Sequence, residues 1–278
     1  MIMETCRAKL ARRLVPVLEA LRWSRYKLQC PRLRKALKTM PAKNLVYAIN
    51  ISLRYRYVYV DNPKTGCSSL KSALVELEVR DTQPELDYYD WRIFHNRGKS
   101  PLRRITDLPT GAPLGYLYRE GYQFITFVRN PYTRVLSCYR DKILKNDPLK
   151  ATILRLLGHA EPSLDIPVSF EQFVKAIAGQ TDYEMNVHWR PQTSQTLYEI
   201  LDYSFVGRFE RYQEDFAALF AHLGIPEAER PPSRHLNRTR EGAQEGCAAY
   251  YTPGIQELVH RRYRKDFENF GYPYELPE

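Results

Sequence analysis

The chain has 278 residues, of which 44% are hydrophobic and 27% are charged, and its formal net charge is +10. This length suits one large α/β domain or two small ones, and the composition excludes disordered and fibrous proteins. The longest uncharged apolar runs are far below the ~20 residues that a spanning helix needs, and no signal-peptide core is present. The sequence therefore predicts a soluble globular protein.

Basic charge is concentrated in residues 1–40, which hold 11 Lys and Arg against two acidic residues, whereas the other 31 Lys and Arg and 30 acids nearly cancel. Leucine and valine recur there at helical spacing, although Pro16 should kink or divide the helix. We expect a basic helical extension over residues 1–40 and the main domain over residues 41–278. The extension either packs on the domain or contacts a membrane surface or an acidic polymer. Nucleic acid is not expected, because no aromatic stacking platform accompanies the charges.

Two strands are expected next, at residues 45–51 and 55–60, and the second leads into a candidate anion site. The following residues are Asp61-Asn62-Pro63-Lys64-Thr65-Gly66-Cys67-Ser68-Ser69, and residues 70–77 have a helical pattern. Unpaired N–H groups at a helix start attract anions, while Lys64 supplies a full charge and Ser68 and Ser69 supply hydroxyls. The order differs from the GxxxxGK[ST] loop of ATP and GTP enzymes, because Lys64 precedes Gly66. A plain strand-to-helix turn with an exposed lysine is the alternative.

A second anion-binding pattern follows a possible short strand at residues 91–95 and a buried strand at residues 122–128. The second strand ends at Arg129, and Pro131 is suited to the first turn of a helix that reaches about residue 144. Arg129 should therefore project from the carboxyl end of a strand, where open α/β sheets bind ligands. Arg134 and Ser137 lie on adjacent turns of the helix, and arginine can hold a phosphate through two hydrogen bonds.

The rest of the chain completes an α/β pattern. Residues 145–200 are interrupted by prolines, are helical in parts, most clearly at residues 170–178, and form a helical insert that suits an acceptor cleft or a scaffold. Residues 203–206 resemble a buried strand, and a last helix opens at Thr252-Pro253 and closes at Gly271. We predict a P-loop-like central parallel sheet flanked by helices, with the insert on its acceptor side.

Taken together, the two anion segments resemble the signature pair of the sulfotransferases that use 3′-phosphoadenosine 5′-phosphosulfate. The loop from Pro63 to Lys71 resembles the segment that holds the 5′-phosphosulfate, and Arg129-x-Pro131-x-x-Arg134-x-x-Ser137-x-Tyr139 resembles the 3′-phosphate segment. The sequences of the two segments are most similar to those of the carbohydrate branch that includes the HNK-1 and chondroitin enzymes. Further matches are Tyr139-Arg140-Asp141-Lys142, His188-Trp189, Val206-Gly207-Arg208-Phe209-Glu210 and residues 266–272.

This resemblance implies which residues bind the donor. The residues expected to bind the 5′-phosphosulfate are Lys64, Thr65, Gly66, Cys67, Ser68 and Ser69. Those expected to bind the 3′-phosphate are Arg129 and Ser137. Phe209 either flanks the adenine or is a core residue. Arg238, in a segment resembling a late loop that closes over the donor, either meets a phosphate or is solvated. Sulfuryl transfer depends on positioning and charge stabilisation, and Lys64 suits the leaving phosphate. No divalent metal is expected.

A general base should accept the proton of the attacking hydroxyl, and histidine is the usual candidate. His95 lies between the two donor segments, where related polysaccharide sulfotransferases have a catalytic histidine. His188 is the second candidate, because it precedes Trp189 in the insert, although a structural histidine beside an aromatic residue is the alternative. The expected catalytic residues are thus His95, Lys64 and His188.

The chain has five cysteines, which is an odd number, and they are widely spaced, which predicts neither a metal site nor a disulfide framework. The Golgi members of the resembled family are typically membrane-anchored and disulfide-bonded, so this chain departs from them. We therefore expect a cytoplasmic setting, with possible peripheral contact to a membrane.

The sequence favours an enzyme that transfers sulfate from the activated donor to a hydroxyl of a carbohydrate or glycan-like acceptor. Two alternatives remain open. One is a non-enzymatic binder of acidic polymers or membrane surfaces with a degenerate nucleotide site, and the other is a nucleotide-dependent phosphotransferase, which the loop order around Lys64 disfavours.

Overall fold

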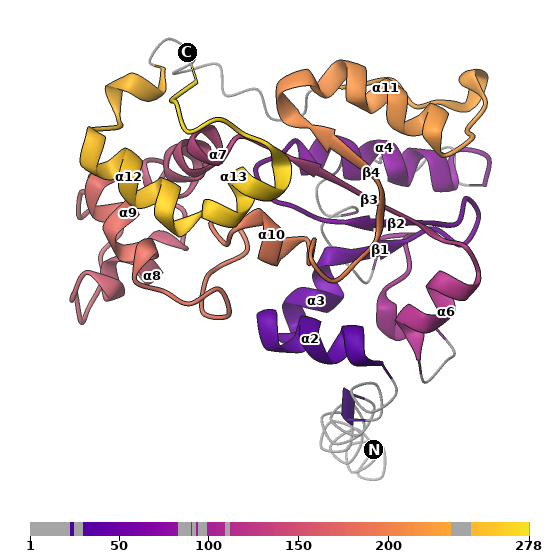
Figure 1. Ribbon diagram of the computed structural model, residues 1–278, viewed down its shortest axis with the longest axis horizontal. Helices are drawn as coiled ribbons and strands as arrows, with labels where there is room; N and C mark the ends of the chain where they lie inside the picture. The colour runs from indigo at the N-terminus through magenta and orange to yellow at the C-terminus, as the bar shows by residue number, and fades with distance from the viewer. Residues whose placement is uncertain are drawn as a thin grey trace, which may run out of the picture.

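The computed structural model describes residues 23–24, 30–82, 90, 93, 99–108, 112–234 and 246–277. A four-stranded sheet of order β1-β2-β3-β4 forms the centre of this described part, from strands β1 (Ile49–Ile51), β2 (Tyr57–Val60), β3 (Gln123–Val128) and β4 (Tyr203–Arg208) (Figure 1). β2, β3 and β4 are parallel, whereas β1 pairs antiparallel with β2. The predicted α/β class and parallel sheet are confirmed, and the antiparallel edge strand is an addition to them.

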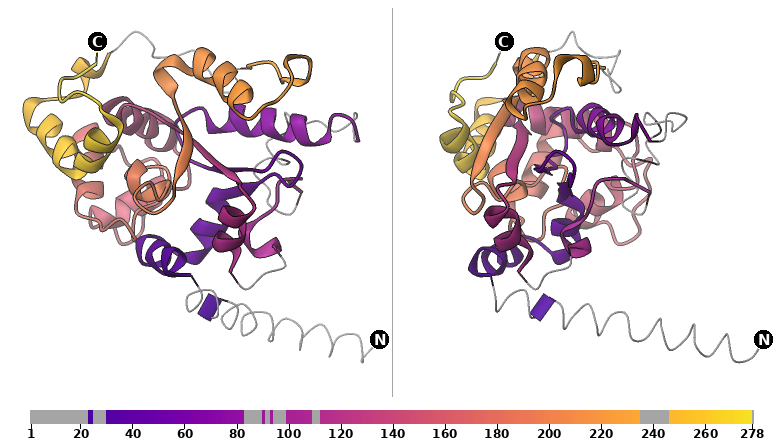
Figure 2. Two further views of the ribbon diagram at one scale, coloured as in Figure 1. Left: turned by 45° about the vertical axis from the view of Figure 1, so that its right-hand side comes forward. Right: turned by 90° about the vertical axis from the view of Figure 1, so that its right-hand side faces the viewer.

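Helices cover both faces of the sheet because the side chains of each strand alternate between the faces. Tyr57 and Tyr59 of β2 pack against α4 (Cys67–Val79) and α11 (Tyr212–His222). Val58 and Val60 point to the opposite core, which contains residues of α2 (Pro31–Thr39), α3 (Ala42–Ala48) and α6 (Pro113–Arg119). Figure 2 shows in two further views that α4 and α11 lie side by side on one face and α2 and α3 on the other.

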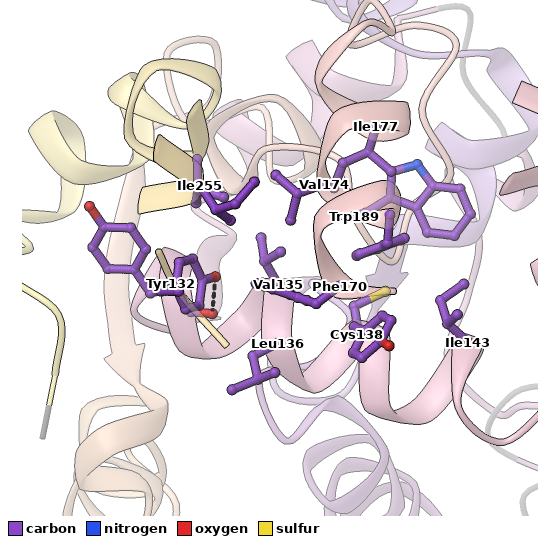
Figure 3. Packing of buried hydrophobic residues seen from close by; sticks show 14 of the residues in the cluster. Tyr132, Val135, Leu136, Cys138, Ile143, Phe170, Val174, Ile177, Trp189 and Ile255 are labelled. Carbon is purple, nitrogen blue, oxygen red and sulfur yellow. Dashed lines mark hydrogen bonds between the residues drawn. The ribbon is translucent and has the colours of Figure 1, made fainter. Parts of the chain in front are cut away.

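A third core lies beyond the carboxyl ends of the strands and, within the described residues, is formed mostly by helices, with no strand residue in it. It joins α7 (Pro131–Cys138), the π-helical turn Tyr139–Ile143, α8 (Lys150–Leu156), α9 (Phe170–Ala178), α12 (Pro253–Arg262) and α13 (Arg264–Phe270). In Figure 3, Val135 and Cys138 of α7 lie among Phe170, Val174 and Ile255, with Trp189 beside them. Most of the predicted insert therefore packs with the C-terminal helices. The short α10 (Gln192–Gln195) follows Trp189 and leads toward β4.

Shorter turns complete the described structure, as 3-10 helices at Ile105–Asp107, Phe209–Arg211, Glu227–Glu229 and Cys247–Ala249. The described cysteines Cys30, Cys67, Cys138 and Cys247 are free thiols. Within the described residues, no helix is long and apolar enough to span a membrane.

The structure corrects two element predictions. Residues 45–48, predicted as the start of a strand, belong to α3, because Pro41 opens a helix whose Leu45 and Ala48 share one buried face. The last helix, predicted as continuous, is divided at Tyr263 into α12 and α13 before Gly271 ends it in the left-handed conformation. The predicted helix at residues 170–178 is confirmed, with a capping box between Ser169 and Gln172.

The predicted N-terminal extension is only partly described, because residues 1–22 and 25–29 lie outside the described residues. Its last ten residues belong to the sheet's packing layer, since Leu33, Ala36 and Met40 are fully buried in the core beneath β2. The boundary at residue 40 stays a prediction, as does any contact of the extension with a membrane or a polymer. The predicted strand at residues 91–95 lies outside the described residues except for Ile93.

Candidate active site at the carboxyl ends of the strands

Three loops meet at one edge of the sheet because β2, β3 and β4 run in the same direction. Lys64 follows β2, Arg129 follows β3, and Phe209 follows β4. Arg129 connects all three: its Nη1 donates to the carbonyl oxygen of Lys64 at 3.2 Å, and its guanidinium carbon lies 4.2 Å from the centre of the Phe209 ring. Residues that the sequence placed in separate motifs therefore form one site.

The loop after β2 has the backbone of an anion cradle. Lys64 and Gly66 both have positive φ angles, 72° and 80°, and α4 begins directly after Gly66. A Cβ atom at Gly66 would lie 2.7 Å from the Tyr212 ring, so this position needs glycine for its space as well as its backbone angle. The hydroxyl of Thr65 donates to the Asn62 carbonyl at 2.7 Å and thereby closes the turn.

The first turn of α4 supplies the remaining predicted donor contacts. Cys67, Ser68 and Ser69 are half-buried there, where helical N–H groups lack intrahelical partners and the helix dipole is positive. Burial raises the pKa of the Cys67 thiol to about 11. Cys67 is therefore a neutral group at this helix end, and its thiol is no nucleophile at neutral pH.

Lys64 is held by Asp141, a residue that sequence analysis did not assign to the site. Its Nζ lies 2.9 Å from Asp141 Oδ2, and Lys142 and Lys145 approach the same carboxylate at 3.3 Å and 3.8 Å. Burial disfavours the Asp141 charge, but the attraction of Lys64 and Lys142 outweighs it and lowers the pKa of the carboxyl group. Asp141 lies in the π-helical turn after α7, and such turns often occur at functional sites. Its signal in the sequence was the motif Tyr139–Lys142.

Arg129 is oriented along α7 toward the predicted 3′-phosphate residues. Its Nε donates to Thr133 Oγ1 at 2.9 Å, and Ser137, which is half-buried, follows Thr133 by one helical turn on the same face. Burial lowers the pKa of Arg129 to about 10, against the attraction of Glu210, so the guanidinium is still charged at neutral pH. Arg129, Thr133 and Ser137 thus form one polar row with a fixed positive charge.

Arg134 looks like a second phosphate ligand in the sequence, but the structure gives it another role. Its side chain is fully buried and donates to the backbone carbonyls of Pro63, Arg190 and Val187 at 3.0, 2.8 and 3.3 Å. Arg134 therefore ties the Lys64 loop to the insert on both sides of His188.

His188 lies beside the loop that carries Lys64. Its Nδ1 is 2.7 Å from Asn186 Oδ1, and burial, together with the charges of Lys142 and Lys64, lowers its pKa to about 3. The imidazole is therefore neutral at pH 7, close to the ammonium group of Lys64. His95 and Arg238, the other candidates, lie outside the described residues.

Two further residues, not predicted from the sequence, connect the loops of the site. Glu210 accepts a hydrogen bond from the Asn130 backbone at 2.6 Å and another from the Tyr272 hydroxyl at 3.0 Å, so it joins the loops after β3 and β4 to the C-terminal segment. Gln192 contacts both the Lys64 loop and Arg129. Glu210 belongs to the matched motif at residues 206–210. Gln192 gives no signal in a single sequence, because it is a buried glutamine in a short helix.

The protein thus has an α/β sheet with basic residues in two loops at the carboxyl edge of its parallel strands. A family model described as "Sulfotransferase family" matches residues 47–273. The chain therefore belongs to this sulfotransferase family, and both loops and the insert fall within the matched residues.

Individual relatives agree with this assignment at low identity. The chain is 26% identical to carbohydrate sulfotransferase 14 of Danio rerio over 86% of its own length and 65% of the relative, and 27% identical to the Homo sapiens protein of that name over 83% and 61%. Carbohydrate sulfotransferase 12 of Mus musculus is 28% identical over 79% of this chain and 58% of the relative. The chain thus spans less than two thirds of the length of these relatives. No solved structure gives a significant match.

Proposed function

We propose that the protein transfers a sulfuryl group from 3′-phosphoadenosine 5′-phosphosulfate to a hydroxyl of a carbohydrate or glycan-like acceptor. Family membership and the names of the relatives support this reaction class. The observation that carries the proposal is the direct contact between the two basic segments, in which Arg129 Nη1 donates to the Lys64 carbonyl. Two anion sites this close together suit a nucleotide with phosphate groups at both ends of one ribose.

In the proposed reaction, the acceptor oxygen bonds to sulfur while the bond from sulfur to the 5′-phosphate oxygen breaks. That electron pair stays on adenosine 3′,5′-bisphosphate, and Lys64 and the α4 N-terminus stabilise the resulting charge. Arg129 and Ser137 hold the 3′-phosphate, and Phe209 flanks the adenine. Asp141 neutralises Lys64 until the donor's anionic groups replace it as the partner of the ammonium.

The proton of the attacking hydroxyl goes to a general base, for which His95 stays the first candidate. A base works best with a pKa near the working pH, and a pKa of about 3 makes His188 a weak base before the donor binds. The negative charge of a bound donor beside His188 would raise its pKa, so His188 stays the second candidate. For His95→Ala, we expect retained affinity for the bisphosphate and lost transfer, and undiminished turnover would move the base elsewhere.

The test of the site is calorimetric titration with adenosine 3′,5′-bisphosphate, together with turnover from radiolabelled donor. Lys64→Ala and Arg129→Ala should each reduce binding or turnover by about 100-fold or more, since each removes a charge from a phosphate. Lys175→Ala and Arg264→Ala are matched controls, because both residues are exposed and pair only with glutamates on their own helices in the described structure. If either site variant bound the bisphosphate like the parent, the site assignment would be wrong.

The acceptor is best identified by a screen with labelled donor over polysaccharides, glycolipids and small alcohols. A carbohydrate acceptor should show the highest turnover if the names of the relatives carry over to this chain. Transfer in the presence of a chelator tests the expectation that no divalent metal takes part. The cytoplasmic setting stays a prediction that rests on the cysteine pattern.

A further inference from the structure

Gln192 occupies a position between the two loops of the site. It is the first residue of α10 and is fully buried. Its Oε1 accepts hydrogen bonds from Asn62 Nδ2 at 3.0 Å and from the backbone N–H of Arg129 at 2.9 Å, and its Nε2 donates to the backbone carbonyl of Arg129 at 2.7 Å. One side chain therefore holds the backbone of Arg129 on both sides and also reaches the loop of Lys64.

Asn62 transmits this contact to the Lys64 loop. It is fully buried two residues before Lys64, and its Nδ2 also donates to the Phe127 carbonyl at 2.9 Å. Its own carbonyl receives the Thr65 hydroxyl that closes the turn. The position of the Lys64 loop is thus defined relative to β3 through Asn62, and relative to Arg129 through Gln192.

The backbone of Gln192 is itself anchored, so the side chain has a firm support. The N–H groups of Gln192 and Thr193 both donate at 2.7 Å to the carboxylate of Asp266, which is fully buried in α13. Only an amide side chain satisfies the contacts of Gln192 with Asn62 and Arg129, because it offers an acceptor to two donors and a donor to the Arg129 carbonyl. Glutamate would place an oxygen against the Arg129 carbonyl.

We infer that Gln192 is a positioning residue that fixes the spacing between the Lys64 loop and Arg129, and that this spacing gives selectivity for adenosine nucleotides with both 5′ and 3′ phosphates. This inference rests on the proposed function. When two sites are held at the right separation, binding of one phosphate brings the other to its site at a high effective concentration. When the separation is not held, the second phosphate contributes much less, while a ligand with one phosphate loses little.

The experiment compares the affinities of the full-length chain for three ligands, measured by calorimetry: adenosine 3′,5′-bisphosphate, adenosine 5′-monophosphate and adenosine 3′-monophosphate. For the parent we expect the bisphosphate to bind at least about 100-fold more tightly than either monophosphate. Gln192→Ala and Gln192→Glu should reduce this preference by about tenfold or more and leave the monophosphate affinities within about threefold. A role limited to stability would lower the melting temperature and leave the preference unchanged.

Gln180→Ala is the matched control. Its amide oxygen accepts from Trp189 Nε1 at 3.0 Å in the same insert, its backbone carbonyl accepts from Arg262, and neither hydrogen bond involves the two loops. This variant should keep the parent's preference for the bisphosphate.

Asn62→Ala removes the hydrogen bond between Asn62 and Gln192 from the side of the Lys64 loop. This variant tests the inference even if the Gln192 variants fail to unfold cooperatively. Asn62→Ala should also reduce the preference for the bisphosphate over the monophosphates. In the double variant with Gln192→Ala, the two reductions in this preference should not add. An unchanged preference in the folded variants overturns the inference and leaves the proposed function intact. If the parent does not prefer the bisphosphate, the proposed function fails and the inference fails with it.

Discussion

Lys71 forms a fully buried ion pair with Asp61, at 2.5 Å, directly beneath the Lys64 loop. Burial alone would lower the pKa of Lys71, but the interactions with Asp61, Tyr47 and Cys67 together outweigh it and the pKa is raised. Its Nζ also lies 4.5 Å from the centre of the Tyr47 ring. Although Lys71 stands in the donor-loop motif, its described contacts stabilise the end of β2 and the start of α4.

Lys71→Met should therefore destabilise the protein by about 3–5 kcal/mol, because it leaves the Asp61 carboxylate buried without its partner. The double variant Asp61→Asn, Lys71→Met should recover much of this loss, since it removes the uncompensated charge. Urea unfolding of both variants measures the difference. A double variant no more stable than the single one would show that the pair is not the cause.

His188 makes a pH-dependent contribution to stability that can be measured. Its pKa is about 3 in the folded protein and roughly 6.5 in an unfolded chain, so between these values the unfolded state binds the extra proton. The stability that His188 contributes is complete above about pH 6.5 and is lost as the pH falls toward 3. Carboxylates such as Asp141 add to the same trend, because its pKa is also lowered.

His188→Gln should therefore lose less stability between pH 7 and pH 5 than the parent. Denaturant unfolding at the two pH values gives the comparison, and His159→Gln is the control because His159 is exposed. Equal losses in the parent and in His188→Gln would contradict the lowered pKa.

At the scale of elements, two glycines allow β4 and α11 to pack under the Lys64 loop. A Cβ atom at Gly207 would lie 2.5 Å from the Phe127 ring, and the Phe127 ring is 5.5 Å from that of Tyr212, which packs against Gly66. The column Gly207, Phe127, Tyr212 and Gly66 thus leads from β4 to the anion cradle. Its spacing is set by packing between elements far apart in the sequence.

Gly207→Ala should destabilise the protein by about 1–3 kcal/mol, since Phe127 has to move in a closely packed core. It should also weaken binding of adenosine 3′,5′-bisphosphate, because Tyr212 supports the loop. Gly207→Ala combined with Phe127→Leu should recover stability. Gly254→Ala is the control, because a Cβ atom there meets no atom within 4 Å. Equal thermal unfolding of Gly207→Ala and the parent would argue against the close contact.

At the scale of the whole molecule, the basic extension and the domain can be separated by truncation. A cut after residue 40 would remove Leu33, Ala36 and Met40 from the core, whereas a cut after residue 22 leaves the described part intact. The shorter cut removes five Lys and Arg and two Glu.

Removal of residues 1–22 should leave the affinity for adenosine 3′,5′-bisphosphate within about twofold, because none of the described residues of the site belongs to the removed segment. Binding to anionic vesicles or polysaccharides at low salt should weaken, since the removed segment is basic. Calorimetry and vesicle co-sedimentation measure the two effects. Loss of nucleotide binding would contradict this prediction and place part of the site in the removed segment.

The sequence by itself determined the features that depend on neighbouring residues. The strand-loop-helix at Lys64, the Pro131 helix start and the helix at residues 170–178 all follow from local sequence patterns, and the structure confirms them. Parallel strands then bring Lys64, Arg129 and Phe209 to one edge, and the α/β pattern predicts this position for Arg129.

Only the tertiary structure decided which polar residues of the motifs make buried contacts within the fold. Arg134 and Lys71 stand in donor motifs, but their described contacts are to backbone carbonyls and to a buried carboxylate. Asp141 stands in the matched motif Tyr139–Lys142, but the sequence did not indicate its partner, and Gln192 gave no signal, because the partners of these side chains at the site lie 77 and 63 or more residues away. A motif records residue types and spacing along the chain, whereas the partner of a charge depends on burial and on contacts that form only when distant segments pack together.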